Sequence, residues 1–138
     1  MCIRDSFNRE RNKEMFGVKF LAKENIPRKI SGRLGFEPGP MQTLVKFDPE
    51  AASFYEHCDR VILSDGALPA KYKMMLVMCI GAVRMCSECV SQSMRAALNL
   101  GATRREILEA LRVAFVSGGA QTVRAAKEAL ETVLAGVK

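Results

Sequence analysis

Residues 74–100 read MMLVMCIGAVRMCSECVSQSMRAALNL, and this stretch decides the fold class. Met74–Val83 is apolar nearly all round a helix, which is typical of a helix at the centre of a bundle. Apolar helical propensity continues to Leu100, but one helix over 70–100 would be far longer than is usual in a small domain. We therefore expect a break near Met85–Ser87, with Cys86 or Ser87 as the N-cap of a second helix.

The chain after residue 47 is predicted to be helical throughout. Asp48-Pro49-Glu50 supplies an N-cap, a first-turn proline and a first-turn acid, and apolar residues then recur at helical spacing. Gly101 is expected to end the helix that holds the cysteines, and Thr103–Glu106 reads as a capping box that starts another. The apolar residues of the first of these helices are Phe54, Tyr55, Cys58, Val61 and Ile62. No strand pattern is found, so we predict an all-α bundle of about five core helices.

The domain organisation follows from the same patterns. We predict an irregular, basic N-terminal arm over residues 1–46 and a single helical domain over residues 47–138. The arm holds ten Lys and Arg against five Asp and Glu, whereas the remainder holds eleven against ten. Glycines and prolines at 32–40 interrupt the arm. The first six residues could also be a cloning remnant, so they carry no argument about the fold.

Composition limits the classes of function. With 138 residues, 49% of them hydrophobic, the chain suits one globular domain. The net charge is +6, but the basic residues are scattered and match no nucleic-acid-binding pattern, so we expect no nucleic-acid partner. No apolar run reaches the length of a membrane span and no signal pattern starts the chain, so we expect no membrane partner and a cytoplasmic protein.

Cys86-Ser87-Glu88-Cys89 is the motif with the clearest chemistry. Two cysteines three residues apart at a helix start can form a disulfide with little backbone movement, and the helix N-terminus favours their thiolates. Such a pair can exchange with a disulfide or reduce a peroxide. The competing interpretation makes them small buried apolar residues, as we expect for Cys58 and Cys79. Five cysteines in all argue against a secreted disulfide framework.

No metal or cofactor is expected. A zinc site would need two further ligands, and His57 is the single histidine of the chain. Glu88 lies between the two cysteines and would oppose a thiolate, so we expect it to face solvent. Lys71, Lys73 and Arg84 flank the central helix, where we expect them to be solvated.

Three segments together resemble the carboxymuconolactone decarboxylase / alkylhydroperoxidase D superfamily. They are Leu68–Lys71, the C-x-x-C motif, and the run from Ala96 to Leu111, within a similarity that spans roughly 48–135. The resemblance implies an all-helical fold assembled as trimers or hexamers. It also implies reduction of peroxides or disulfides with electrons from a dithiol carrier, with Cys89 as the attacking thiol and Cys86 as its partner.

Two positions depart from that resemblance. Peroxidase members carry a histidine four residues after the second cysteine and a glutamate twelve residues before the first; here these positions are Ser93 and Met74. Ser93 can donate a hydrogen bond to a thiolate but is no base at neutral pH, so the usual proton relay is missing. His57 is a candidate replacement for that base, although a structural or solvent-facing role is the plainer interpretation.

Two hypotheses come from these residues. The first is a C-x-x-C thiol–disulfide oxidoreductase, with weak alkyl hydroperoxide reductase activity, whose catalytic residues are Cys86 and Cys89. Ser93, Glu88 and His57 are the candidates for a supporting role. Its partners would be a small hydroperoxide or disulfide, a dithiol reductant and further copies of the chain. The alternative is a small-molecule binding protein, or a cofactor-free enzyme, with vestigial cysteines.

Overall fold

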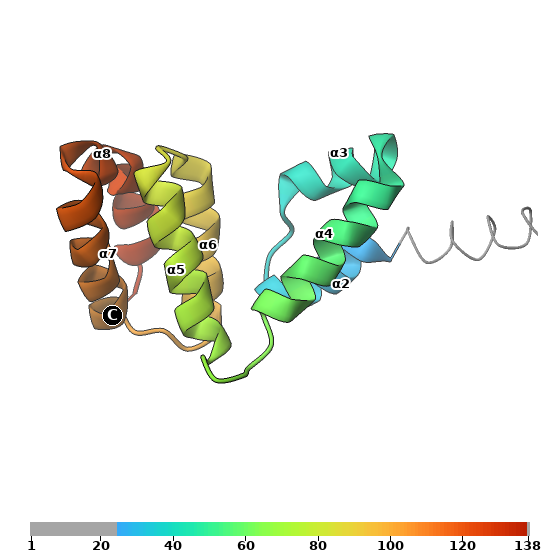
Figure 1. The fold of residues 1–138 in the computed structure, drawn as a ribbon, viewed down its shortest axis with the longest axis horizontal. Helices are drawn as coiled ribbons and strands as arrows, with labels where there is room; N and C mark the ends of the chain where they lie inside the picture. The colour runs from blue at the N-terminus through green and yellow to red at the C-terminus, as the bar shows by residue number, and fades with distance from the viewer. Residues whose placement is uncertain (1–24, 138) are drawn as a thin grey trace, which may run out of the picture. The chain divides into compact units, whose positions relative to one another are not determined.

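A computed structural model describes residues 25–137, and every regular element in this range is a helix (Figure 1). The elements are α2 (Ile26–Leu34), α3 (Gly39–Phe47), α4 (Pro49–Ile62), α5 (Ala70–Val83), α6 (Ser87–Asn99), α7 (Arg104–Gly118), α8 (Ala120–Ala129) and a π-helical segment η1 (Leu130–Leu134). The predicted all-α class is confirmed. Among these helices, none has the length and apolar content that crossing a membrane requires.

The described residues form two compact units. The first holds 25–32 and 36–58, with α2, α3 and most of α4, and the second holds 33–35 and 59–137, with α5 to η1. The boundary that we expect between arm and helical domain, at residues 46 and 47, remains a prediction. The first 24 residues of that arm, including the suspected cloning remnant, lie outside the described residues.

The first unit is more helical than its sequence suggests. Of the stretch rich in glycine and proline, only residues 35–38 lie between helices. Pro27 and Pro40 each fall in the first turn of a helix. The N–H groups of a first turn have no carbonyl partner within the helix, so the N–H that proline lacks removes no helical hydrogen bond. As predicted, Asp48 caps α4, with its Oδ1 accepting from the Ala51 N–H at 3.0 Å. Phe54 and Tyr55 of α4 are exposed rather than buried.

The second unit is a helical bundle centred on α5. This helix packs most extensively against α6, and also against α7 and α8 (Figure 1). Its largest fully buried side chains include Met78, Met94, Ile107, Leu111 and Leu134, which come from three helices and η1. The methionines of α5 and α6 are buried, but Met85 is exposed. Its exposure follows from its place in the turn between α5 and α6.

Local signals set the helix ends of this unit. Gly101 has φ +88° after α6 and Gly119 has φ +72° after α7, the left-handed conformation that glycine adopts without strain. Thr103 and Glu106 form the predicted capping box at the start of α7. The structure adds one cap that the sequence interpretation missed: Asp65 Oδ1 accepts from the Ala70 N–H at 2.8 Å and so begins α5.

Candidate functional site: the Cys86–Cys89 turn

The turn that ends α5 positions the first cysteine. The Cys86 N–H donates to Gly81 O at 2.9 Å, and the Met85 N–H donates to Ala82 O at 3.1 Å. These two bonds make a Schellman motif, which needs a left-handed residue at the place of Met85. Met85 has φ +62°, and it is the one residue other than glycine with a positive φ in the described range. The break predicted between 85 and 87 is confirmed.

Cys86 also begins the next helix. It is the N-cap of α6, and its Sγ accepts a hydrogen bond from the Cys89 N–H at 3.3 Å. Sulfur here takes the role that a serine or aspartate oxygen usually has at an N-cap. One residue therefore closes α5 with its backbone N–H and opens α6 with its side chain.

Cys86 and Cys89 are joined by a disulfide, with their Cα atoms 5.2 Å apart. Cys89 is exposed and Cys86 is partly exposed, so a reagent in solution can reach the pair. Cys58 and Cys79 are free thiols. The disulfide can be reduced to two thiols by two electrons and two protons, and it can form again on oxidation, which is the chemistry that the spacing indicates.

Gly81 permits the close approach of α5 to the second cysteine. A Cβ added at Gly81 would lie 3.0 Å from Cys89 Cβ, and its carbonyl already accepts from Cys86. Gly81 thus contacts both cysteines, one through a hydrogen bond and one through van der Waals contact. The sequence interpretation missed this role. The available signal was a lone glycine inside a long helical pattern, which often marks close packing.

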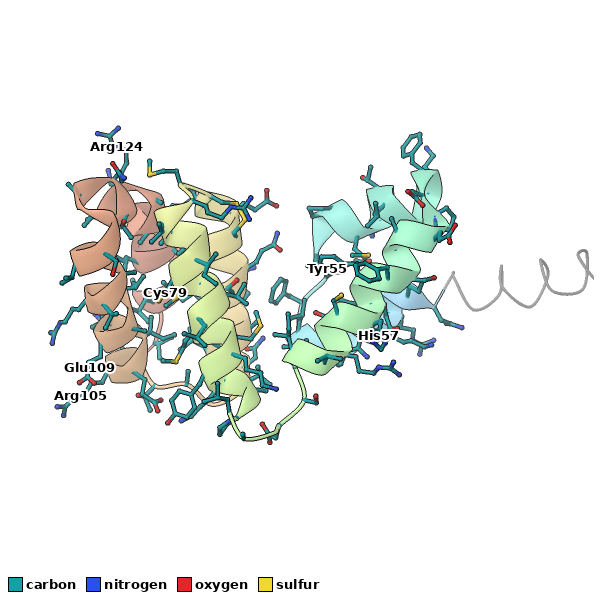
Figure 2. All side chains as sticks on the ribbon, in the orientation of Figure 1. Tyr55, His57, Cys79, Arg105, Glu109 and Arg124 are labelled. Atoms are coloured by element: carbon teal, nitrogen blue, oxygen red, sulfur yellow. A yellow bond between two sulfur atoms is a disulfide. The ribbon has the colours of Figure 1, made fainter. Side chains whose placement is uncertain are left out.

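The predicted supporting residues lie on two helices, Glu88 and Ser93 on α6 and His57 on α4. Ser93 is buried on α6, one turn after Cys89, and Met74 is buried on α5. Glu88 is exposed as expected, and its carboxylate accepts from Gln92 Nε2 at 2.9 Å. His57, labelled in Figure 2, lies on α4 in the first unit, whereas the cysteines belong to the second, and its role as a base remains a prediction. No group of three or more His, Cys, Asp or Glu residues that could hold a metal ion occurs in residues 25–137.

A polar bridge joins the first turns of α5 and α7. Glu106 Oε1 accepts from Lys71 Nζ at 2.8 Å and from the Tyr72 hydroxyl at 3.2 Å. The Lys71 hydrogen bond, together with those from Thr103, lowers the pKa of Glu106 to about 2. Lys71 is thus held in an ion pair, where solvation was expected. The bridge fixes two helix starts relative to each other.

An apolar groove of about 580 Å³ lies between α5 and α7. Leu76 and Ile80 from α5 and Val113 from α7 line it, with Arg84 at the end where the cysteine turn begins. Cys79, labelled in Figure 2, also lines it, and its thiol donates to Ala110 O at 3.3 Å. Burial raises the pKa of this thiol, so it stays protonated at neutral pH.

The fold and the site together define a class: an all-helical protein with an accessible C-x-x-C disulfide at a helix start. Residues 49–132 match the model of the carboxymuconolactone decarboxylase family. A crystal structure of a candidate carboxymuconolactone decarboxylase from Burkholderia xenovorans LB400 is similar, with a TM-score of 0.69 and 22% sequence identity. The similarity covers 83% of this chain and 97% of that one. No curated protein matches the chain. The chain belongs to the carboxymuconolactone decarboxylase family, since the family's sequence model matches more than half of the chain.

Proposed function

We propose that this protein is a C-x-x-C thiol–disulfide oxidoreductase whose redox pair is Cys86 and Cys89. One observation carries the proposal: the two cysteines form a disulfide at the N-terminus of α6, in a turn that leaves Cys89 exposed. Exposure and a helix N-terminus both favour exchange with thiols in solution. An external dithiol is the reductant, and a small disulfide or hydroperoxide is the substrate.

The hydroperoxide activity is proposed to be weak. Rapid reduction of a peroxide needs a group that accepts or relays the proton of the attacking thiol. Ser93 and Met74 stand where the resembled peroxidases carry histidine and glutamate, and neither can act as a base at neutral pH. Thiol–disulfide exchange is less demanding, because the helix N-terminus alone raises the thiolate fraction.

Turnover with dithiothreitol as reductant tests this function. We would measure consumption of a small disulfide and of cumene hydroperoxide by wild type, Cys86→Ser and Cys89→Ser. Either substitution is expected to reduce disulfide turnover to the uncatalysed rate, because one thiol cannot close the cycle. Cys79→Ser is the matched control and should retain wild-type turnover, since Cys79 is free and its thiol stays protonated. Equal rates in all four proteins would refute the proposal.

A binding function without catalysis is the second candidate, and the apolar groove between α5 and α7 favours it. A groove of about 580 Å³ is within the size range of small-molecule sites, which are lined mainly by apolar side chains. In that case the cysteines would be vestigial. The discriminating result is a wild-type protein with no turnover in either assay that still binds an apolar fluorescent dye, with binding weakened by Ile80→Lys.

We also propose that the protein acts as a homo-oligomer. The groove is flanked by exposed apolar side chains, including Ile80, Val113 and Val116, the last of which is 89% exposed. Contiguous apolar surface on a water-soluble domain usually marks an interface.

A further inference from the structure

Met85, Cys86 and Cys89 bring three sulfur atoms to one short turn. Met85 and Cys89 are exposed, and Cys86 is partly exposed. The Cα atoms of the two cysteines are 5.2 Å apart, so both sulfurs can bind the same ion once the disulfide is reduced. Thiolate and thioether sulfurs are soft ligands, which select Cu(I) over the hard ions Mg²⁺ and Ca²⁺. The reduced turn therefore has the donor atoms of a soft-metal site.

We propose that the reduced turn binds a Cu(I) ion, with the thiolates of Cys86 and Cys89 as principal ligands and the thioether of Met85 as a further ligand. The proposal goes beyond the proposed oxidoreductase function and does not depend on it, because binding requires only that both thiols are reduced. It also departs from the expectation that no metal is bound. That expectation was based on the four ligands of a zinc site.

The backbone at Met85 is the observation that extends the site beyond the two cysteines. Met85 has φ +62°, and within residues 25–137 no other residue except glycine has a positive φ. Glycine would adopt this conformation without strain. The side chain of Met85 is 44% exposed, so packing gives little in return for the strain. Such an outlier indicates a function for the side chain, and an exposed thioether beside two thiols has the chemistry of a soft-metal ligand.

The charges around the turn favour the complex. Two thiolates and Cu(I) together carry a net negative charge, which the positive end of α6 stabilises. Arg84 lies two residues before Cys86 and adds a positive charge to this part of the chain. The Cys89 N–H donates to Cys86 Sγ at 3.3 Å, a hydrogen bond that also stabilises a metal-bound thiolate. The Glu88 carboxylate opposes the complex, but it is exposed and accepts from Gln92 Nε2.

The backbone of the turn does not depend on the S–S bond. The Cys86 N–H donates to Gly81 O at 2.9 Å, and the Met85 N–H donates to Ala82 O at 3.1 Å. Reduction leaves the partners of both bonds in place, so rotation of the cysteine side chains is enough to admit an ion between the sulfurs. A site that is organised before its ligand arrives loses less conformational entropy on binding.

The same turn is a poor site for zinc. A structural zinc ion takes four protein ligands. No group of three or more His, Cys, Asp or Glu residues suited to a metal occurs in the part of the chain that the structure describes. The free thiol of Cys79 competes poorly for Cu(I), because it donates to Ala110 O and burial raises its pKa. The observations therefore favour a soft ion that needs few ligands, and they favour the turn over Cys79.

Binding releases protons and transfers no electron. The S–H bond of each cysteine breaks, its proton goes to solvent, and the sulfur forms a bond to Cu(I). The oxidation states of copper and sulfur stay the same. The disulfide has no thiolate to offer, so the protein binds Cu(I) in its reduced form and not in its oxidised form.

Competition with the chelator bicinchoninate tests the site. The protein is reduced with a phosphine, freed of the reductant, and titrated with Cu(I) under anaerobic conditions. Wild type is expected to take one equivalent of Cu(I) from the chelator, and Cys86→Ser and Cys89→Ser are each expected to lose this ability. Cys79→Ser is the matched control and should take the same amount as wild type. Cu(I) that stays with the chelator in wild type, or binding that survives Cys86→Ser or Cys89→Ser, overturns the proposal.

Two further measurements guard against a loss that comes from misfolding. Cys86→Ser keeps a good N-cap residue at the start of α6. The oxidised wild type has the native sequence and fold, and it should leave all Cu(I) with the chelator. Equal uptake by the oxidised and the reduced protein overturns the proposal. So does a reduced wild type that binds Zn²⁺ more tightly than Cu(I).

X-ray absorption at the copper edge tests the part assigned to Met85. Wild type is expected to show a sulfur neighbour at longer distance than the two thiolates, and Met85→Leu is expected to lose it, because leucine has similar bulk and no sulfur. Met94→Leu is the matched control, since Met94 is fully buried on α6. An unchanged spectrum in Met85→Leu, or the same loss in Met94→Leu, removes Met85 from the ligands and overturns this assignment.

The copper site and the oxidoreductase function fail in different ways. If both cysteines are needed for disulfide turnover but the reduced protein leaves Cu(I) with bicinchoninate, the copper site is wrong and the proposed function stands. If the reduced pair takes up Cu(I) but no substrate is turned over, the copper site stands and the proposed function is wrong.

Discussion

At the scale of single residues, Met85 is where the backbone departs from its ordinary preferences. A left-handed conformation costs an L-residue with a side chain about 1–2 kcal/mol, and glycine is the usual choice at this point of a Schellman motif. Met85 nevertheless has φ +62°, directly before Cys86. The surrounding bonds to Gly81 O and Ala82 O hold it there. Strain next to the proposed redox pair fits the general association of such residues with functional sites.

Replacing Met85 should change the free energy of unfolding, and the direction should depend on how well the new residue tolerates a positive φ. Met85→Gly removes the left-handed penalty but adds freedom to the unfolded chain, so we expect stability equal to wild type or higher by up to about 1 kcal/mol. Met85→Val should lose about 1 kcal/mol or more, because β-branched residues are rarely found at positive φ. Urea unfolding of the oxidised proteins measures both.

Met85→Ala is the control for that pair of variants. Alanine keeps the backbone penalty and removes the exposed side chain, so it should lie between glycine and valine in stability. If Met85→Gly proves less stable than Met85→Ala, the left-handed conformation does not determine the differences in stability. Side-chain contacts of Met85 would then have to explain it.

At the scale of elements, the bridge from Lys71 to Glu106 links α5 to α7 and makes that link dependent on pH. The folded-state pKa of Glu106, about 2, lies below its ordinary value of 4.5. A group with a depressed folded-state pKa stabilises the fold above the unfolded value. That contribution is therefore complete above pH 4.5 and is lost as the pH falls from about 4.5 to about 2.

Glu106→Gln should accordingly destabilise the protein at pH 7 and have a smaller effect at pH 3, where the wild-type carboxylate is losing its advantage. Urea unfolding at the two pH values gives the comparison. Glu109→Gln is the matched control on the same helix, because Glu109 pairs with Arg105 on an exposed surface (Figure 2). Exposed pairs contribute little, so this variant should change stability by at most about 0.5 kcal/mol at either pH. An equal loss of stability for Glu106→Gln at both pH values would contradict the predicted contribution of the Lys71–Glu106 bridge.

Helix ends were predictable from sequence where the chemistry is local. The cap at Asp48, the box at Thr103 and the left-handed Gly101 each depend on residues within four positions, and all three are confirmed. The start of α6 at Cys86 was predicted to within one residue. The pairing of Lys71 with Glu106 was missed, since it joins residues 35 positions apart. The contact of Gly81 with Cys89 was also missed, because it depends on how two helices approach each other.

At the scale of the whole molecule, the second unit has one face that its own helices do not cover. Leu76 and Ile80 on α5 and Val113 and Val116 on α7 are all more than half exposed. The groove between these helices is almost wholly apolar, and it lies on α5 away from the face that carries Gly81 and contacts Cys89. A second copy of the chain could therefore cover this face and leave the disulfide accessible.

Charge placed on this face should shift the protein toward the monomer. We expect wild type to be oligomeric at micromolar concentration, and Ile80→Lys or Val113→Lys to reduce its mass in light scattering, because a lysine in an apolar interface must lose its hydration. Val123→Lys is the control, since Val123 is exposed on α8 outside the groove and should not affect assembly. Disulfide turnover per chain should be retained in the dissociated variants if the turn that holds Cys86 and Cys89 functions within a single copy. A monomeric wild type, or dissociation by Val123→Lys alone, would show that the groove between α5 and α7 is not the assembly surface.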